Sequence, residues 1–280
     1  MTAGPPGAEI RREMLAAATW LAEHPEAATG TPVTSDLTID EALLLHSIGW
    51  EPVELVFGVS VTSVPATFWT WVPGEITSAS DAHNLAVQTA SGRIGQECAH
   101  AGGHGVVGVR VEVEVHPRHI DVGLVGTAVR PIGAPAPAGR PFVSDLSARD
   151  FVLLVNSGWY PKGLAFGASF ICAPRRDAMT ALRQSSQNVE MTNLTQALYA
   201  ARETAMERMQ QSGLQMASQG VVGVRITEGP LSFARHVIGF TAWGTAVALG
   251  GDGHIGMRPE VVLPLDDAVL QFAAESLRDR

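Results

Sequence analysis

Histidine, a versatile metal ligand and proton carrier, is unevenly spread along this sequence. Six of the nine histidines fall between residues 46 and 119. Within that stretch, "ECAHAGGH" places Glu97, His100 and His104 at i, i+3 and i+7, which is one face of a continuous helix. A carboxylate with two imidazoles is a reasonable ligand set for a divalent metal ion. Gly102 and Gly103 favour a helix end before His104, so the alternative is a polar helix terminus.

A second candidate site lies in "RVEVEVHPRHIDVGLV" at residues 110–125, where alternating valines predict a hairpin with one buried face. With "HPRH" as the loop, Val113 lies opposite Val122. The same register places Glu114 opposite Asp121, and like charges across a ladder repel. We therefore expect either a cation between the two carboxylates or two solvated carboxylates at an exposed edge. The candidate cations are a metal ion, Arg118, and protonated His116 or His119.

The two clusters together supply the candidate metal ligands, and zinc or another divalent ion is the cofactor that they suggest. The strand between them keeps the clusters about 30 Å apart, so they cannot form one site. The candidate ligands are Glu97, His100, His104, Glu114, His116, His119 and Asp121.

Tryptophans offer a different chemistry, because a flat ligand can stack on their rings between subunits. The alternative is core packing, which the Gly-Trp pairs at two predicted helix ends favour. The residues concerned are Trp50, Trp69, Trp71, Trp159 and Trp243.

The elements that must position all these side chains are encoded twice. Residues 35–61 and 144–170 align without a gap, with 12 of 27 positions identical. Thr38 with Glu41, and Ser147 with Asp150, begin a short capped helix in each copy. A Gly-Trp-x-Pro turn and a β-rich run follow. Each copy then continues with a long amphipathic helix, "GVVGVR" (105–110 and 220–225) and a strand ending in "GTAV" (126–129 and 244–247).

This doubled order predicts an α+β fold of two tandem β-α-β-β units, each preceded by a short capped helix. We expect an N-terminal helix and linker at 1–34, unit 1 at 35–130, a Pro/Ala/Gly linker at 131–143, unit 2 at 144–249, and a C-terminal loop and helix at 250–280. In unit 2, Gly213, Gln215 and Gln219 stand where unit 1 has Cys98, His100 and His104. The candidate ligands therefore belong to unit 1 alone.

A long helix ending in glycine, then "GVVGVR", then a hairpin ending in "GTAV", resembles the YbjQ-like family of small bacterial proteins, and it does so in both units. The resemblance implies a β-α-β-β fold, ring-shaped homo-oligomers, commonly of five units, and heavy-metal binding. The motif residues themselves are Gly, Val, Ala and Thr, which carry no ligand chemistry. The capped helix and the duplication depart from the short single-unit form.

Composition excludes several classes of partner. The net charge of −9 argues against nucleic acid and anionic membrane surfaces. No apolar run is long enough to cross a bilayer, and the N-terminus does not read as a signal peptide. Two cysteines cannot build a disulfide framework and fit a reducing cytoplasm.

Common enzyme motifs are absent from the sequence, since it contains no G-x-S-x-G, P-loop, H-E-x-x-H or C-x-x-C. We therefore expect a non-catalytic, oligomeric binding protein, with a divalent or heavy metal as the leading ligand. The alternatives are a binder of small aromatic molecules and a purely structural ring or scaffold. Its expected partner is itself. Two fused units per chain cannot fill a single ring of five units, so either five chains supply ten units or three chains form a six-unit ring. Closed rotational symmetry is the norm for homo-oligomers, and five chains are favoured over three.

Overall fold

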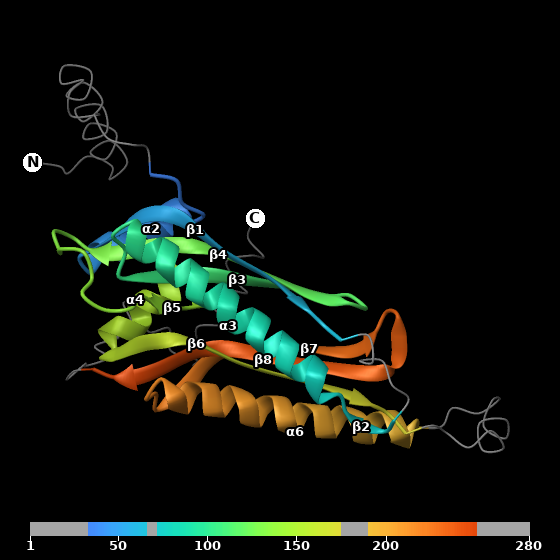
Figure 1. The fold of residues 1–280 in the computed structure, drawn as a ribbon. Helices are drawn as coiled ribbons and strands as arrows, with labels where there is room; N and C mark the ends of the chain where they lie inside the picture. The colour runs from blue at the N-terminus through green and yellow to red at the C-terminus, as the bar shows by residue number, and fades with distance from the viewer. Residues whose placement is uncertain (1–32, 66–71, 175–189, 251–280) are drawn as a thin grey trace, which may run out of the picture.

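The computed structural model describes residues 33–65, 72–174 and 190–250. The N-terminal helix predicted within 1–34 and the C-terminal helix predicted within 250–280, together with Trp69 and Trp71, lie outside these residues. Two similar halves lie one above the other, and each contributes one long helix (Figure 1). The elements are α2 (Ile39–Ser47), β1 (Trp50–Ser63), β2 (Gly74–Glu75), α3 (Thr77–His100), β3 (Gly105–Val115), β4 (His119–Pro131), β5 (Phe142–Val143), α4 (Ala148–Asn156), β6 (Trp159–Cys172), α6 (Thr192–Gln215), β7 (Gly220–Leu231) and β8 (Ala234–Leu249).

The strand order confirms that the two units share one fold. Unit 1 contributes the order β1-β4-β3 to one four-stranded sheet, and unit 2 contributes β6-β8-β7 to the other. Each unit thus has a first strand, a crossover by the long helix, and a hairpin whose second strand lies in the centre. The hairpin register is also as predicted, with Val113 opposite Val122 and Glu114 opposite Asp121.

Local sequence signals determine how each unit begins. The Thr38 side chain accepts from the Glu41 N–H and the Glu41 carboxylate accepts from the Thr38 N–H, which completes a capping box. Ser147 accepts from the Asp150 N–H in the same position of unit 2. The Gly-Trp turns that follow require a left-handed residue, and Gly49 and Gly158 have φ of 76° and 79°.

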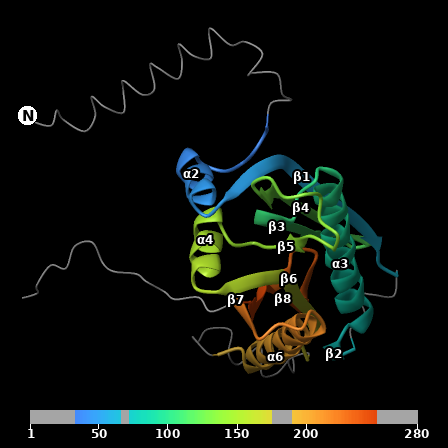
Figure 2. The same cartoon turned by 90° about the vertical axis from the view of Figure 1, so that its left-hand side faces the viewer.

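The long helix of unit 1 lies between the two units. α3 packs on β1 and β4 of its own unit and on β6 of unit 2, whereas α6 packs on β6 and β8 from the opposite side (Figures 1 and 2). Apolar residues at helical spacing line each contact, as predicted. The buried residues of these stripes are Val87, Ala90, Ile94 and Cys98 in α3, and Ala201, Ala205 and Met209 in α6.

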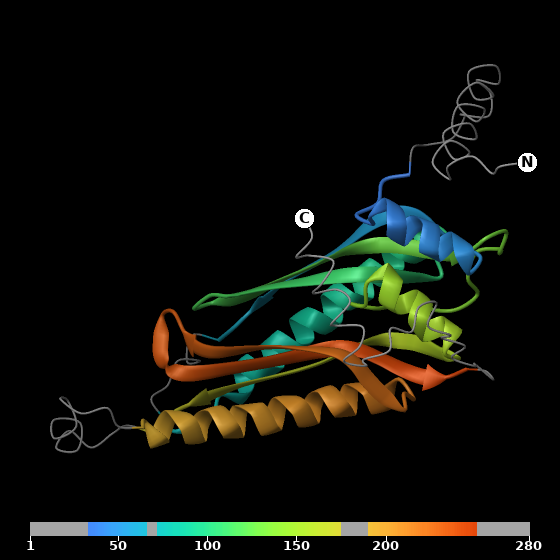
Figure 3. The same ribbon diagram turned by 180° about the vertical axis from the view of Figure 1, so that it is seen from behind.

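Residues expected at the end of the linker instead form a strand. Phe142 and Val143 make β5, which pairs in parallel with Gly105 and Val106 at the edge of the unit 1 sheet. Seen from behind, α2 (blue) and α4 (yellow-green) lie next to each other (Figure 3). The link between the units is therefore part of the sheet, because an open β3 edge offers backbone partners to any extended segment nearby. No described helix is long and apolar enough to cross a membrane.

A buried histidine should make the protein's stability depend on pH. His83 of α3 packs against Phe170 of β6 at 5.8 Å between ring centroids, and burial lowers its pKa to about 4. Its ring is therefore neutral in the folded protein, while the unfolded chain takes up a proton below about pH 6.5. The free energy of unfolding should fall as the pH drops from about 6.5 to about 4, by up to about 3 kcal/mol from this residue.

Urea unfolding at about pH 7 and about pH 4.5 measures this effect. His83→Leu is the matched variant, because unit 2 has Leu198 at the corresponding place in α6. The variant should lose most of the acid-dependent destabilisation. An unchanged difference between the two pH values would show that other groups cause it.

Candidate functional site

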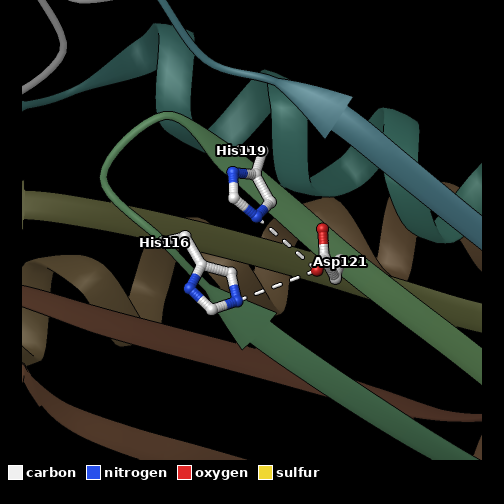
Figure 4. A group of neighbouring side chains, drawn as sticks. All are labelled: His116, His119 and Asp121. Atoms are coloured by element: carbon white, nitrogen blue, oxygen red, sulfur yellow. Dashed lines mark ion pairs between the residues drawn. The ribbon is translucent and has the colours of Figure 1, made fainter.

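The hairpin at the tip of β3 and β4 brings three of the predicted ligands together. The ligand atoms of His116, His119 and Asp121 all lie within 4.8 Å of one another, and all three side chains are half-buried (Figure 4). The two imidazole rings stack at 4.5 Å between centroids. Among the described residues, this is the group of ligand-type side chains whose geometry is compatible with a metal ion.

The same hairpin also places an imidazole between its two facing carboxylates. His116 Nε2 lies 3.2 Å from Glu114 Oε2 and 3.7 Å from Asp121 Oδ2, so the His116 ring lies between the two facing carboxylates. His119 Nε2 lies 3.6 Å from the same Asp121 oxygen. This is one of the cation arrangements that the sequence left open. Glu114 is mostly exposed, so its ion pair with His116 contributes little to stability.

The other predicted cluster does not assemble. α3 ends at His100, Gly102 turns the chain with φ of 78°, and the His104 N–H already donates to Val129 O at 2.8 Å. His104 therefore does not lie on the helix face of Glu97 and His100. This agrees with the alternative given above, in which Gly102 and Gly103 end the helix before His104.

The remaining members of that cluster have other surroundings. The Glu97 carboxylate accepts from the Phe57 N–H at 2.8 Å, which satisfies an amide on the outer edge of β1. His100 is exposed at the helix end. Cys98 is buried and its thiol donates to Gly105 O at 3.4 Å, and burial raises its pKa to about 12. Cys98 is thus a core thiol and a poor metal ligand.

Trp50 is half-buried and packs against a core cluster. Its ring lies 5.2 Å from that of Phe151 in an edge-on arrangement and 6.2 Å from that of Phe142. It therefore holds α4 and β5 against unit 1, and is not free to stack on a ligand.

The residues that do repeat form a hydrogen-bonded network that the sequence did not reveal. In unit 2, Thr245 of "GTAV" donates to Asp145 Oδ1 at 2.6 Å and accepts from the Asp145 N–H at 3.1 Å. The Ser144 hydroxyl lies 2.9 Å from the Thr245 hydroxyl, and Arg225 of "GVVGVR" lies 3.8 Å from Asp145 Oδ2. Burial raises the pKa of Asp145 and outweighs the opposing effects of Thr245 and Arg225.

Unit 1 repeats this network with the equivalent residues. Thr127 donates to Asp36 Oδ1 at 2.5 Å and accepts from the Asp36 N–H at 3.3 Å, and Arg110 pairs with Asp36 at 3.1 Å. The repeated "SDL", "GVVGVR" and "GTAV" passages are thus one structural device, in which threonine anchors the segment that enters each unit. The sequence signal for this network is the joint repetition of the three passages. Residue type alone does not reveal it, because Gly, Val, Ala and Thr carry no ligand chemistry.

Comparison with known proteins extends this picture. A family model described as "Putative heavy-metal-binding" matches residues 162–250. The encapsulin nanocompartment protein Rv1762c of Mycobacterium tuberculosis is 37% identical over 241 residues, covering 83% of this chain and 92% of the relative. No solved structure matches the chain.

The prediction that metal binding is the protein's function is wrong. The relative aligns over nearly its whole length and is named for a nanocompartment. The heavy-metal family model matches only unit 2, which is the unit without the histidine clusters. The YbjQ-like resemblance itself holds for unit 2, while the duplication rests on the shared strand order. The structural scaffold, given above as an alternative, agrees better with the relative.

The length and identity of the alignment with this relative settle the chain's family. The match is not confined to one unit, since 241 aligned residues exceed the length of either. Both repeats and the junction between them are therefore shared. The chain belongs to the family of the encapsulin nanocompartment protein Rv1762c.

Proposed function

We infer that this protein is a non-catalytic structural component of an encapsulin nanocompartment, and that it works by associating with copies of itself. The observation that carries this proposal is the 37% identity to a nanocompartment protein across 92% of that relative's length. The proposal places the chain in the cytoplasm, which agrees with a sequence that has only two cysteines and so cannot build a disulfide framework.

The residues themselves support a structural role. The passages conserved between the two units serve turns, close packing and the threonine anchor. The titratable cluster at the hairpin tip occurs in unit 1 alone. Apolar side chains are left exposed in rows, as on Phe57, Val59 and Val61 of β1, and such rows are typical of surfaces that associate.

We further propose that five chains close one ring. Closed rotational symmetry is the norm for homo-oligomers, and the YbjQ-like resemblance implies rings based on five. Light scattering behind size exclusion should give about five times the chain mass of 29.5 kDa. A measured mass equal to three chains would show that the ring has three chains and not five, and it would still demonstrate self-association.

The compartment role is tested in the cells that make the protein. A tagged full-length chain should sediment with large, closed protein particles that electron microscopy of the same fraction resolves. Treatment that opens the particles should either release the chain from them or dissociate the particles and the chain at the same time. Recovery of the chain only as a small free oligomer, in cells that contain intact particles, would contradict the proposal.

A further inference from the structure

Unit 2 packs on unit 1 through two complementary surfaces, one on each unit. Because the units are repeats, unit 2 also has an equivalent of the unit 1 surface, and unit 1 has an equivalent of the unit 2 surface. The contact within the chain uses neither of these equivalents. We propose that unit 1 of a second copy docks on unit 2 of the first, in the way that unit 2 docks on unit 1 within the chain. This inference rests on the proposed self-association and specifies its interface. Four contacts inside the chain predict the contacts between chains.

The first contact is strand addition to an open sheet edge. The segment leading into unit 2 runs along β3, where Ser144 N–H donates to Val106 O at 2.9 Å. Val109 N–H donates to Ser144 O at 3.0 Å, and Gly108 N–H donates to Leu146 O at 2.7 Å. These bonds cover a bulge where Gly108 has φ of 66°.

Among the described residues, no strand pairs with the corresponding edge of unit 2, which β7 forms. Gly223 has the same φ of 66°, at the equivalent bulge of β7. Val222 and Val224 are 37% and 39% exposed, whereas their counterparts Val107 and Val109 are 0% and 1% exposed. The valines of the identical passage "GVVGVR" are therefore buried in unit 1 and partly exposed in unit 2.

The segment that fits this edge stands at the other end of the chain. Residues 33–37 correspond to 142–146 in the aligned repeat, and they end in the same Ser-Asp-Leu. Thr127 holds Asp36 as Thr245 holds Asp145, so the segment is already shaped for pairing. Ser35 is exposed, while Ser144 is fully buried against β3.

The second contact is an apolar strand face on a long helix. Phe170 of β6 lies in a groove of unit 1, where its N–H bonds to the Ser80 hydroxyl at 3.1 Å and its O accepts from the Ile76 N–H at 2.8 Å. The equivalent groove of unit 2 is open, has a volume of about 560 Å³, and includes Met191, Thr195 and Leu198. These residues stand where unit 1 has Ile76, Ser80 and His83.

The matching strand face is the exposed row on β1. Val61 corresponds to Phe170 and is 65% exposed, and Phe57 and Val59 continue the row. Their counterparts on β6, Phe166 and Ala168, face unit 1 and are half-buried or buried. The groove on α6 and the row on β1 are thus the two unused halves of an existing contact.

The third contact joins the short helices. Ala148 and Val152 of α4 are buried in one cluster with Leu45 of α2 and Val107 of β3. Their counterparts on α2 are Ile39 and Leu43, which are 81% and 64% exposed. The free face of α2 therefore has larger apolar residues at the positions that α4 already buries.

The fourth contact is an ion pair, and it supplies charge complementarity. Glu75 of β2 in unit 1 pairs with Arg208 of α6 in unit 2, and Arg208 also donates to Ala168 O at 2.8 Å. Burial by itself would raise the pKa of Glu75, but hydrogen bonds from Arg208, Ser80 and Ser169 outweigh it and lower that pKa.

Both partners of this pair have counterparts that are exposed in the chain. Arg93 occupies the position of Arg208 in α3, and it donates to Val59 O as Arg208 donates to Ala168 O. Glu190 precedes α6 as Glu75 precedes α3, at the same distance along the repeat. The docked copy should therefore pair Glu190 of one chain with Arg93 of the next.

Each of the four contacts joins a surface of unit 1 in one chain to a different surface of unit 2 in the next, so the association is head-to-tail. Every such surface is covered only if the chains close into a ring. A two-fold dimer would leave both an open β7 edge and an exposed β1 face. The unit-to-unit repeat inside the chain thus continues from chain to chain.

Charge reversal at the ion pair tests the docking. Arg93→Glu and Glu190→Arg, each alone, should weaken association at least tenfold, as measured by light scattering across a dilution series. The double variant should recover most of the wild-type mass, because the pair is restored with opposite polarity. Arg118→Glu at the hairpin tip is the control, since it makes the same change outside the four contacts.

Hydrogen exchange gives a second measure that does not depend on mass. Amides of Gly223 and Val224 should be protected in the wild-type oligomer and exchange faster in either single variant. A wild-type chain that is a monomer would remove the proposed self-association and this interface together. An oligomer whose mass and β7 exchange ignore the reversals, or one that the double variant fails to restore, would overturn the interface alone.

Discussion

Replacing Gly167 by alanine should lower the free energy of unfolding by about 3 kcal/mol. A methyl group at this position of β6 would lie 2.2 Å from the carbonyl oxygen of Ala205 and 2.5 Å from the nitrogen of Met209. Both atoms belong to the backbone of α6, so relief requires the whole helix to move away from the sheet. Gly58 makes the same approach to α3, with its Cβ position 2.2 Å from Ala90 O.

Urea unfolding at a fixed protein concentration measures this loss, because the stability of an oligomer depends on concentration. Gly123→Ala in β4 is the matched control, since no atom lies within 4 Å of its Cβ position. We expect that variant to stay within about 0.5 kcal/mol of the wild type. Equal stability of the two variants would mean that the long helix is not held this close to the strand.

Thr245→Val should cost about 3 kcal/mol, although the two side chains have the same shape. Thr245 is fully buried and is the partner of the Asp145 carboxylate, the Asp145 N–H and the Ser144 hydroxyl. Valine leaves those groups buried with fewer hydrogen bonds, and an unsatisfied buried polar group costs about 1–3 kcal/mol. The segment that Asp145 anchors should then loosen from β3.

Two readouts distinguish this from a general loss of stability. Unfolding in urea should show the free-energy loss, and the amides of Gly108 and Val109 should lose hydrogen-exchange protection first. Thr241→Val on the same strand is the control, because its hydroxyl makes one long bond of 3.4 Å to Thr227 O. It should cost less than about 1 kcal/mol. Unchanged protection of β3 in Thr245→Val would show that the threonine does not anchor the segment.

Features of the fold that depend on neighbouring residues could be predicted from the sequence. The capping box at Thr38 and the left-handed turns at Gly49 and Gly158 follow from residue type at fixed short spacing. The register of the hairpin follows from the alternation of valines, because a slip by one residue would expose the apolar face. That register also brought His116, His119 and Asp121 together.

Glu97, His100 and His104 do not share one helix face, because α3 ends before His104. The spacing of Glu97 and His104 defines one face only if the helix continues, and Gly102 ends it. Metal binding is not the protein's function for a different reason. Histidines and carboxylates suggest chemistry wherever they gather, but the residues that repeat in both units are those that build contacts.

The sequence by itself determined that the chain holds two copies of one unit, and how each begins, turns and pairs its hairpin. Only the tertiary structure decided that residues 142–146 join the sheet of the preceding unit, that α3 lies between the units, and that Thr245 holds Asp145 across 100 residues of chain. These contacts use backbone hydrogen bonds and surface shape, which leave no period in the side-chain pattern. They depend on which edges and faces remain open after each unit has folded, and that is a property of the assembled surfaces.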